Sequence, residues 1–174
     1  MTFARRCTIT TQHAWLASLE AELHATLADR CATEAALRRA DRAMRLASIE
    51  ARRPGIDFFS PAKLAAYKGS CFMLLGQPTQ AREHCQEALA LLYPAAHTRA
   101  FVELDLATTF AQRSEVERAC DVARTTLSTL GPNERTPRLV TRVQDFRRSV
   151  DGNGSAPCVR DFDEAYQVAF GYRR

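Results

Sequence analysis

Apolar residues recur every three or four positions along almost the whole chain, which is the spacing of one face of an α-helix. The first such segment predicts a helix over residues 12–28. Its apolar positions are Trp15, Leu16, Leu19, Leu23 and Leu27. No segment alternates between apolar and polar residues in steps of two, so we expect no β-sheet. The sequence therefore predicts an all-α fold.

The same spacing predicts further helices, separated by residues that interrupt helical structure. They span residues 32–49, 61–75, 96–112, 115–130, 137–150 and 159–170, with one more between the turn at 76–78 and residue 92. The interruptions fall at Arg53-Pro54-Gly55, Tyr93-Pro94 and Gly131-Pro132-Asn133. Proline ends helices because it has no backbone N–H and restricts the residue before it.

Two helix starts carry recognisable capping sequences. Ser60 precedes Pro61, so the serine can cap the free N–H groups while proline occupies the first helical position. Ser114 and Glu117 form the pattern of a capping box and predict that the next helix starts there.

The chain divides into a helical domain over residues 1–150, a linker over 151–157 with the sequence DGNGSAP, and a terminal helix within 158–174. That helix carries Phe162, Tyr166 and Phe170 on one stripe, and so short a helix is marginal alone in water. The stripe must be buried. We expect the helix to fold back on helix 137–150 and cap the domain, with exchange into a second copy, giving a homodimer, as the alternative.

Helical hairpins joined by short turns raise the question of internal repeats. The spacing of a tetratricopeptide (TPR) repeat is followed in the second hairpin by Gly69, Phe72, Gly76, Ala81, Cys85, Ala88 and Pro94. The third hairpin has Leu106, Ala107, Phe110, Ala119 and Ala123, and the first, more loosely, has Leu23, Leu27, Ala36, Ala40 and Ala43. Small residues at these positions let two helices approach closely. The prediction is a TPR-like α-solenoid of about three hairpins with C-terminal capping helices.

Three stretches resemble the carboxy-terminal region of actinomycete transcriptional regulators, in which a helix-turn-helix DNA-binding domain precedes a TPR-like sensor. They are PAKLAAYKGSCFMLLGQPTQAREHCQEALALLYP (61–94), LDLATTFAQRSEVERACDVA (104–123) and VRDFDEAY (159–166). The resemblance implies a regulatory sensor or protein-interaction module. The helix-turn-helix domain itself is absent, so the resemblance does not extend to direct DNA binding, and we expect a free-standing module or a fragment.

Composition narrows the choice of partners. The 24 basic and 20 acidic residues alternate along most helices and leave a net charge of only +4, so we expect no direct nucleic-acid partner. No apolar run approaches the roughly 20 residues that span a bilayer, and we expect a cytoplasmic protein without a membrane partner. The six cysteines contain no CxxC pair, which favours reduced thiols in structural positions.

No sequence pattern of catalysis is present. The chain lacks the GxSxG, GxxxxGK[ST], GxGxxG and HExxH motifs, and its four histidines are scattered. The acidic residues Asp161, Asp163 and Glu164 on the last helix are interpreted as charges favoured by a helix N-terminus. We therefore expect no enzyme activity, no cofactor and no metal ion.

The first helix of each stacked hairpin is expected to line a concave face that binds a peptide, a protein or a small molecule. The residues predicted to face it are Glu22, Lys63, Tyr67, Ser70, Met73, Phe101, Asp105, Thr108 and Gln112. Tyr67 and Phe101 offer apolar contact, whereas Lys63 and Asp105 offer orienting charges. Two other functions stay open: a scaffold or dimerisation partner of a biosynthetic enzyme, and an enzyme with an unrecognised helical site.

Overall fold

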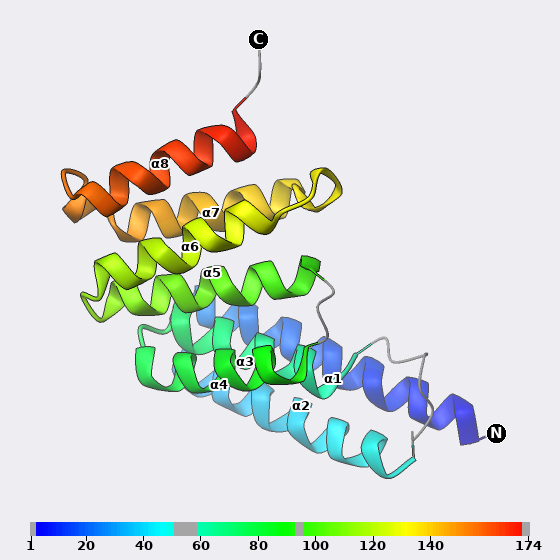
Figure 1. The fold of residues 1–174 in the computed structure, drawn as a ribbon. Helices are drawn as coiled ribbons and strands as arrows, with labels where there is room; N and C mark the ends of the chain where they lie inside the picture. Colours follow the sequence, from blue (N-terminus) through cyan, green and yellow to red (C-terminus); the bar gives the residue numbers. More distant parts are fainter. Residues whose placement is uncertain (1–2, 51–58, 93–95, 172–174) are drawn as a thin grey trace.

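The computed structural model describes residues 3–50, 59–92 and 96–171, and all regular structure in these ranges is helical (Figure 1). The α-helices are α1 (Phe3–Thr26), α2 (Arg30–Glu50), α3 (Pro61–Leu74), α4 (Pro78–Leu91), α5 (Ala96–Gln112), α6 (Val116–Thr129), α7 (Pro137–Ser149) and α8 (Pro157–Phe170). Two 3₁₀ turns, η1 (Pro132–Glu134) and η2 (Asp151–Asn153), flank α7. The all-α prediction is confirmed, and the breaks predicted at 53–55 and 93–94 lie outside the described residues.

Most helix boundaries agree with the sequence pattern, but α1 begins at Phe3, well before the predicted residue 12. The cap at α3 is confirmed: the Ser60 hydroxyl accepts a hydrogen bond from the Lys63 N–H at 3.3 Å. The capping box at Ser114 is wrong, because α6 starts one residue later without any side-chain cap. Ser114 instead has a positive φ of 63° and belongs to the end of α5.

The first three hairpins turn in the same way. In each hairpin, the second residue after the end of the first helix has a positive φ: 56° at Ala28, 65° at Gly76 and 63° at Ser114. The residue that follows donates its N–H to a carbonyl five positions back. These bonds are Asp29 to His24 at 2.9 Å, Gln77 to Phe72 at 2.9 Å, and Glu115 to Phe110 at 3.0 Å. This is the Schellman arrangement, which satisfies the last carbonyls of a helix. The three turns therefore have the same backbone geometry although their sequences differ.

The helices are packed as a row of hairpins. Within hairpins, α1 contacts α2, α3 contacts α4, and α5 contacts α6. Between hairpins, α1 contacts α3, α3 contacts α5, and α5 contacts α7. In Figure 1 the row runs from α1 and α2 near the N-terminus to α8 at the opposite end, near the C-terminus. The odd-numbered helices therefore lie side by side in chain order.

The first hairpin packs through alanine, contrary to the predicted leucine face of α1. The buried residues of this hairpin include Ala14, Ala17, Ala21 and Ala25 on α1 and Ala36, Ala40 and Ala47 on α2. Leu16, Leu23 and Leu27 are more than half exposed. Alanine stripes bring two helices close together, and the leucines are then left on the outer side of α1. The places given to Leu23 and Leu27 in the repeat are thus wrong.

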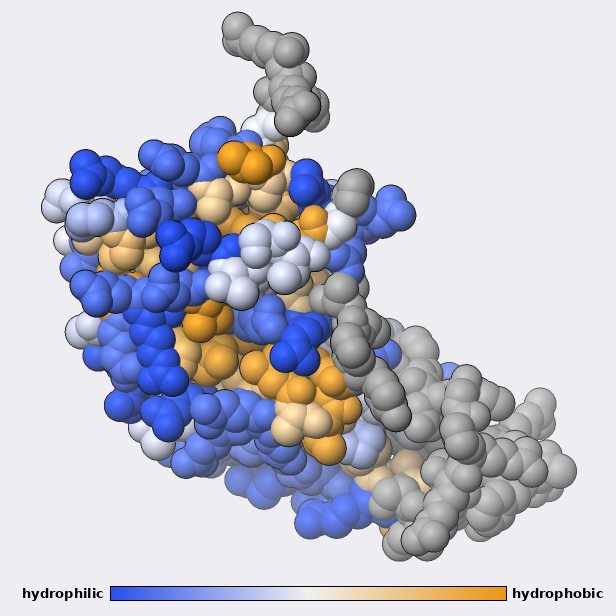
Figure 2. Space-filling view, viewed as in Figure 1, coloured by the Kyte–Doolittle hydropathy of each residue, from blue (hydrophilic) through white to orange (hydrophobic). Residues whose placement is uncertain are grey.

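The surface seen in Figure 2 mixes hydrophobic and hydrophilic residues. On this face, viewed as in Figure 1, the hydrophobic residues gather in small patches between hydrophilic ones.

The terminal helix α8 covers the end of the row within the same chain. It packs along α6, burying Val159, Phe162 and Ala169. It also reaches α7, because the Phe162 ring meets the Phe146 ring edge-on at 4.9 Å. The first turn of α8 contains no acidic residue, so the interpretation of its acids as N-terminal charges is wrong. Asp163 instead forms an ion pair with Arg147 of α7 at 2.6 Å.

Helices α3 and α4 approach each other closely at Gly69. A Cβ atom at this position would lie 2.6 Å from Cys85 Sγ and 3.2 Å from the Cys85 backbone nitrogen. Burial raises the pKa of the Cys71 thiol to about 12 and raises that of Cys85 as well. These thiols are therefore protonated near neutral pH, which fits the predicted structural role.

We predict that Gly69→Leu destabilises the protein by about 1 to 3 kcal/mol or more, because its side chain would force α3 and α4 apart. Gly152→Leu is the control, since a Cβ there would meet no atom within 4 Å. Urea unfolding of both variants measures the difference. Equal stabilities would mean that α3 and α4 do not meet at Gly69.

We also predict that Phe162→Ala lowers the free energy of unfolding by about 3 to 5 kcal/mol, the usual cost of emptying a buried phenylalanine site. Val168→Ala on the same helix removes a side chain that is 85% exposed, and it should change stability by less than about 0.5 kcal/mol. Chemical unfolding of the two variants checks the pair. If both behave like the unmodified protein, α8 does not pack against α6 and α7.

Candidate ligand pocket

A cavity of about 220 Å³ lies on the side of the molecule formed by the odd-numbered helices. All four of these helices contribute to its wall. The lining residues are Trp15 and Glu22 of α1, Phe59 before α3, Lys63, Ala66, Tyr67 and Ser70 of α3, Thr98, Phe101, Val102 and Asp105 of α5, and Arg138 and Arg142 of α7.

Helical spacing explains how each helix presents several residues to the cavity. Lys63, Tyr67 and Ser70 are separated by four and three positions, so they share one face of α3. Arg138 and Arg142 are four residues apart and share one face of α7. The Thr136 cap fixes the start of that helix, because its hydroxyl accepts a hydrogen bond from the Leu139 N–H at 3.4 Å.

Arg142 connects all four odd-numbered helices at the floor of the cavity. Its Nε lies 3.2 Å from Asp105 Oδ1 of α5, and its Nη2 donates to Ser70 Oγ of α3 at 3.3 Å. The same Nη2 lies 3.6 Å from Glu22 Oε1 of α1. Only 13% of the Arg142 side chain is exposed. A cation on the last odd-numbered helix thus contacts the three before it.

Asp105 is a buried carboxylate with incomplete hydrogen bonding. The residue is 3% exposed, and its Oδ1 accepts no hydrogen bond although Arg142 Nε is within ion-pair distance. Burial raises the pKa of Asp105 to about 6, while the Arg142 charge and a hydrogen bond with Ser70 act in the opposite direction. Loss of hydration therefore outweighs the attraction of Arg142.

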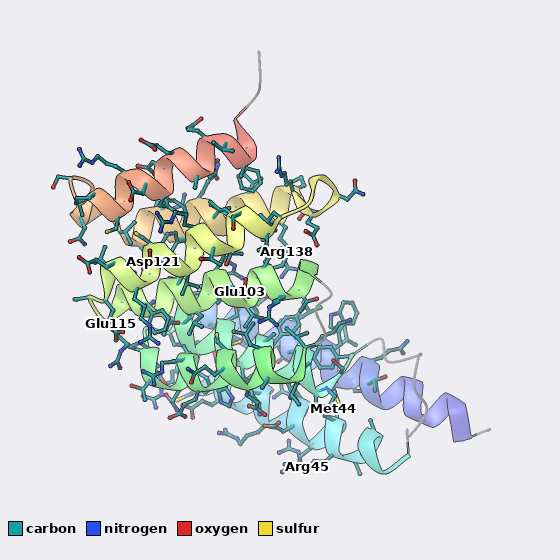
Figure 3. The ribbon with its side chains drawn as sticks, viewed as in Figure 1. Met44, Arg45, Glu103, Glu115, Asp121 and Arg138 are labelled. Carbon is teal, nitrogen blue, oxygen red and sulfur yellow. The ribbon has the colours of Figure 1, made fainter. Side chains whose placement is uncertain are left out.

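Arg138 lies at the mouth of the cavity. Figure 3 labels it near the start of α7, on the side of α5. Its guanidinium carbon lies 5.4 Å from the centre of the Phe101 ring, and its Nη2 lies 3.7 Å from Glu22 Oε2. Glu22 therefore sits between two guanidinium groups, at ion-pair distances that are too long for hydrogen bonds.

Aromatic side chains form the apolar part of the wall. Trp15, Tyr67 and Phe101 are half-buried, and Phe59 is buried with its ring 5.8 Å from that of Tyr67. The cavity thus combines aromatic surface with a small number of charged groups, as ligand sites commonly do.

Most of the residues predicted for the concave face lie together in this cavity. Those that line it are Glu22, Lys63, Tyr67, Ser70, Phe101 and Asp105. Met73, Thr108 and Gln112 do not. Met73 is buried in the core beside α1 and α4, and the buried Thr108 hydroxyl donates to the carbonyl of Leu104 at 3.0 Å. Gln112 Nε2 donates to the Met73 carbonyl at 2.9 Å, which joins the ends of α3 and α5.

Seven residues that line the cavity were not predicted from the sequence: Trp15, Phe59, Ala66, Thr98, Val102, Arg138 and Arg142. The spacing of the two arginines at the start of α7 is a signal that could have identified them. This spacing points to the cavity only when α7 is known to continue the row of α1, α3 and α5.

Neither a metal site nor a membrane-spanning helix is found in the described ranges. No group of three or more His, Cys, Asp or Glu side chains in them is placed to hold a metal ion. Among the helices of that same part of the chain, none has the length and apolar character needed to cross a bilayer.

Comparisons with known proteins identify no relative: no family model, curated protein or solved structure matches this chain. The geometry of the cavity is therefore the guide to the function of the chain.

The raised pKa of Asp105 predicts how stability changes with pH. The folded state holds this proton more tightly than the unfolded chain, in which the pKa is near 3.8. The stability contributed by protonated Asp105 is therefore complete below about pH 3.8 and is lost as pH rises through about 6. Relative to Asp105→Asn, the protein should lose about 2 to 3 kcal/mol of unfolding free energy between pH 4 and pH 7.

Urea unfolding at several pH values measures this difference. Asp121→Asn is the control, because Asp121 is an exposed aspartate on α6, away from the cavity (Figure 3), and this variant should follow the unmodified protein. If the curve of Asp105→Asn also runs parallel to that of the unmodified protein, burial does not govern the Asp105 proton.

Proposed function

We propose that this chain is a TPR-like binding module whose odd-numbered helices form a concave, ligand-binding face. The role is that of a regulatory sensor or interaction domain, without catalysis and without direct contact to nucleic acid. The ligand, a peptide, a small molecule or a segment of a protein, is held in the cavity between α1, α3, α5 and α7.

The TPR-like part of the proposal is supported by repetition in the backbone. The turns at Ala28, Gly76 and Ser114 have the same conformation and the same hydrogen bond. The first helices of successive hairpins also contact one another in order, from α1 to α7. In a stack of repeats, this arrangement gives a continuous surface made of first helices.

The binding role rests on one observation, the charged network of Arg142, Asp105 and Glu22 in the wall of an aromatic cavity. Buried charges are costly, and the raised pKa of Asp105 indicates such a cost here. A stack of helices that is held together by packing alone does not need buried charged groups. A ligand site does need them, because a few fixed polar groups among apolar walls orient the ligand.

The sensor role follows from where the cavity lies. Its wall draws on helices of every hairpin and on α7, so a bound ligand contacts elements that are far apart in the sequence. Binding therefore favours one relative placement of the hairpins, and a partner that contacts the outer surface can distinguish this placement.

The test is a ligand-observed NMR screen with a library that contains anionic, cationic and neutral small molecules and short peptides. Ala66→Trp places a large side chain in the cavity, and Ala90→Trp places the same side chain on an exposed position of α4. We expect ligands that bind the unmodified protein and Ala90→Trp to bind Ala66→Trp at least tenfold more weakly.

Melting temperatures of both variants establish that they are folded. A library without binders, or binders that Ala66→Trp does not affect, would remove the support for a ligand-binding role of this cavity.

A further inference from the structure

The charged groups at the centre of the cavity include two guanidinium groups and two carboxylates. Asp105 is paired with Arg142 at the floor, and Glu22 lies between Arg142 and Arg138. Asp105 is buried, whereas 66% of the Arg138 side chain is exposed. Arg138 is therefore the guanidinium group of this network that is most accessible to an anion from solvent.

Glu22 shows where an anionic group fits. Its two carboxylate oxygens lie 3.6 Å from Arg142 Nη2 and 3.7 Å from Arg138 Nη2. Both distances indicate attraction without a hydrogen bond, so the guanidinium groups keep N–H donors that Glu22 does not use. The space between these arginines accommodates a carboxylate, and the one in the protein fills it incompletely.

The Phe101 ring orients Arg138 for binding the carboxylate of a ligand. Its guanidinium group lies over the Phe101 ring at 5.4 Å, an arrangement that attracts cations. A planar guanidinium fixed in this way loses less conformational freedom when it binds a carboxylate with two N–H groups.

We propose that the cavity binds a small monocarboxylate with an apolar body. Its carboxylate takes the place of Glu22 beside Arg138 and Arg142, and its apolar body packs against Tyr67 and Phe101. This inference rests on the proposed function, because it names the ligand class of the same cavity. The size supports it, since about 220 Å³ suits a compact molecule and not a folded partner.

Glu22 is then an internal competitor of the ligand. It forms no hydrogen bond with either arginine, and 19% of its side chain is exposed, so it can move towards solvent when a ligand arrives. Removing its charge should strengthen the binding of a carboxylate, whereas removing the charge of Arg138 should weaken it.

The probes are phenylacetate, phenylacetamide and phenethylamine, which share one aromatic body and differ in charge. Isothermal titration calorimetry at pH 7.5 on the full chain should show phenylacetate binding at least tenfold more tightly than the amide, and the amine binding most weakly. Arg138→Gln should weaken phenylacetate at least tenfold, and Glu22→Gln should strengthen it severalfold.

Two matched variants separate these effects from general changes of charge. Arg118→Gln removes an arginine that also lies over a phenylalanine ring, Phe110 at 4.0 Å, and pairs with Glu115 at the turn between α5 and α6 (Figure 3). Glu20→Gln removes another carboxylate of α1, one paired with Arg39 at 2.5 Å. Neither control should change phenylacetate binding.

Each alternative result has a distinct meaning. Equal binding of the three probes, tighter binding of the amine, or phenylacetate binding unaffected by Arg138→Gln would overturn the carboxylate assignment while leaving a ligand cavity. The carboxylate assignment would also be overturned if phenylacetate does not bind while neutral or cationic library members do bind, and if Ala66→Trp abolishes the binding of those members. If Ala66→Trp affects no ligand of any charge, the proposed function fails together with this inference.

Discussion

The reach of Arg142 across three neighbouring helices is the interaction on which the cavity depends. From α7 this side chain contacts Glu22 of α1, Ser70 of α3 and Asp105 of α5. Helix packing by alanine, leucine and phenylalanine can hold a row of hairpins together with some freedom to slide. A buried guanidinium with partners on three other helices restricts that freedom, because each displacement separates charges in a poorly hydrated site. The network therefore fixes the positions from which the other cavity residues project.

This network does not serve mainly to stabilise the fold. The pKa of Asp105 is raised because the loss of hydration exceeds the attraction of Arg142. At neutral pH the ionised carboxylate therefore has a higher free energy in the folded protein than in water. The stability must come from packing instead. It does so where Ala81, Cys85 and Ala88 of α4 are fully buried, and where Phe146 and Phe162 meet between α7 and α8. Packing and charge thus have separate roles in this molecule: the first holds the hairpins, and the second shapes the cavity.

The sequence predicted helix positions well and side-chain surroundings less well, for physical reasons. Period and capping are local, so the Ser60 cap and the span of α5 could be recognised directly. The face of α1 could not, because both its alanines and its leucines follow a helical period, and only the close approach of α2 selects the alanines. Ser114 resembled a helix start, yet a Schellman turn uses that position to end the preceding helix. Met73 and Gln112 lay on the predicted face, but Met73 is buried in the core and Gln112 donates a hydrogen bond to its carbonyl, and neither residue lines the cavity. Arg142 was missed because its partners are brought to it by the stacking of hairpins, which no local pattern encodes.

The placement of Glu22 connects the cavity to the arrangement of the whole row. Through its two arginine contacts it joins α1, the first odd-numbered helix, to α7, the last. These contacts are long and without hydrogen bonds, so they can be exchanged at low cost for those of a ligand, whereas the contacts of Arg142 with Ser70 and Asp105 are shorter and less exposed. A ligand that replaces Glu22 would keep the floor of the cavity intact and free α1 from α7 at the same time. The weakest link in the charged network is therefore also the one that spans the greatest distance along the chain, and this is where occupancy of the cavity can alter the relation between the two ends of the molecule.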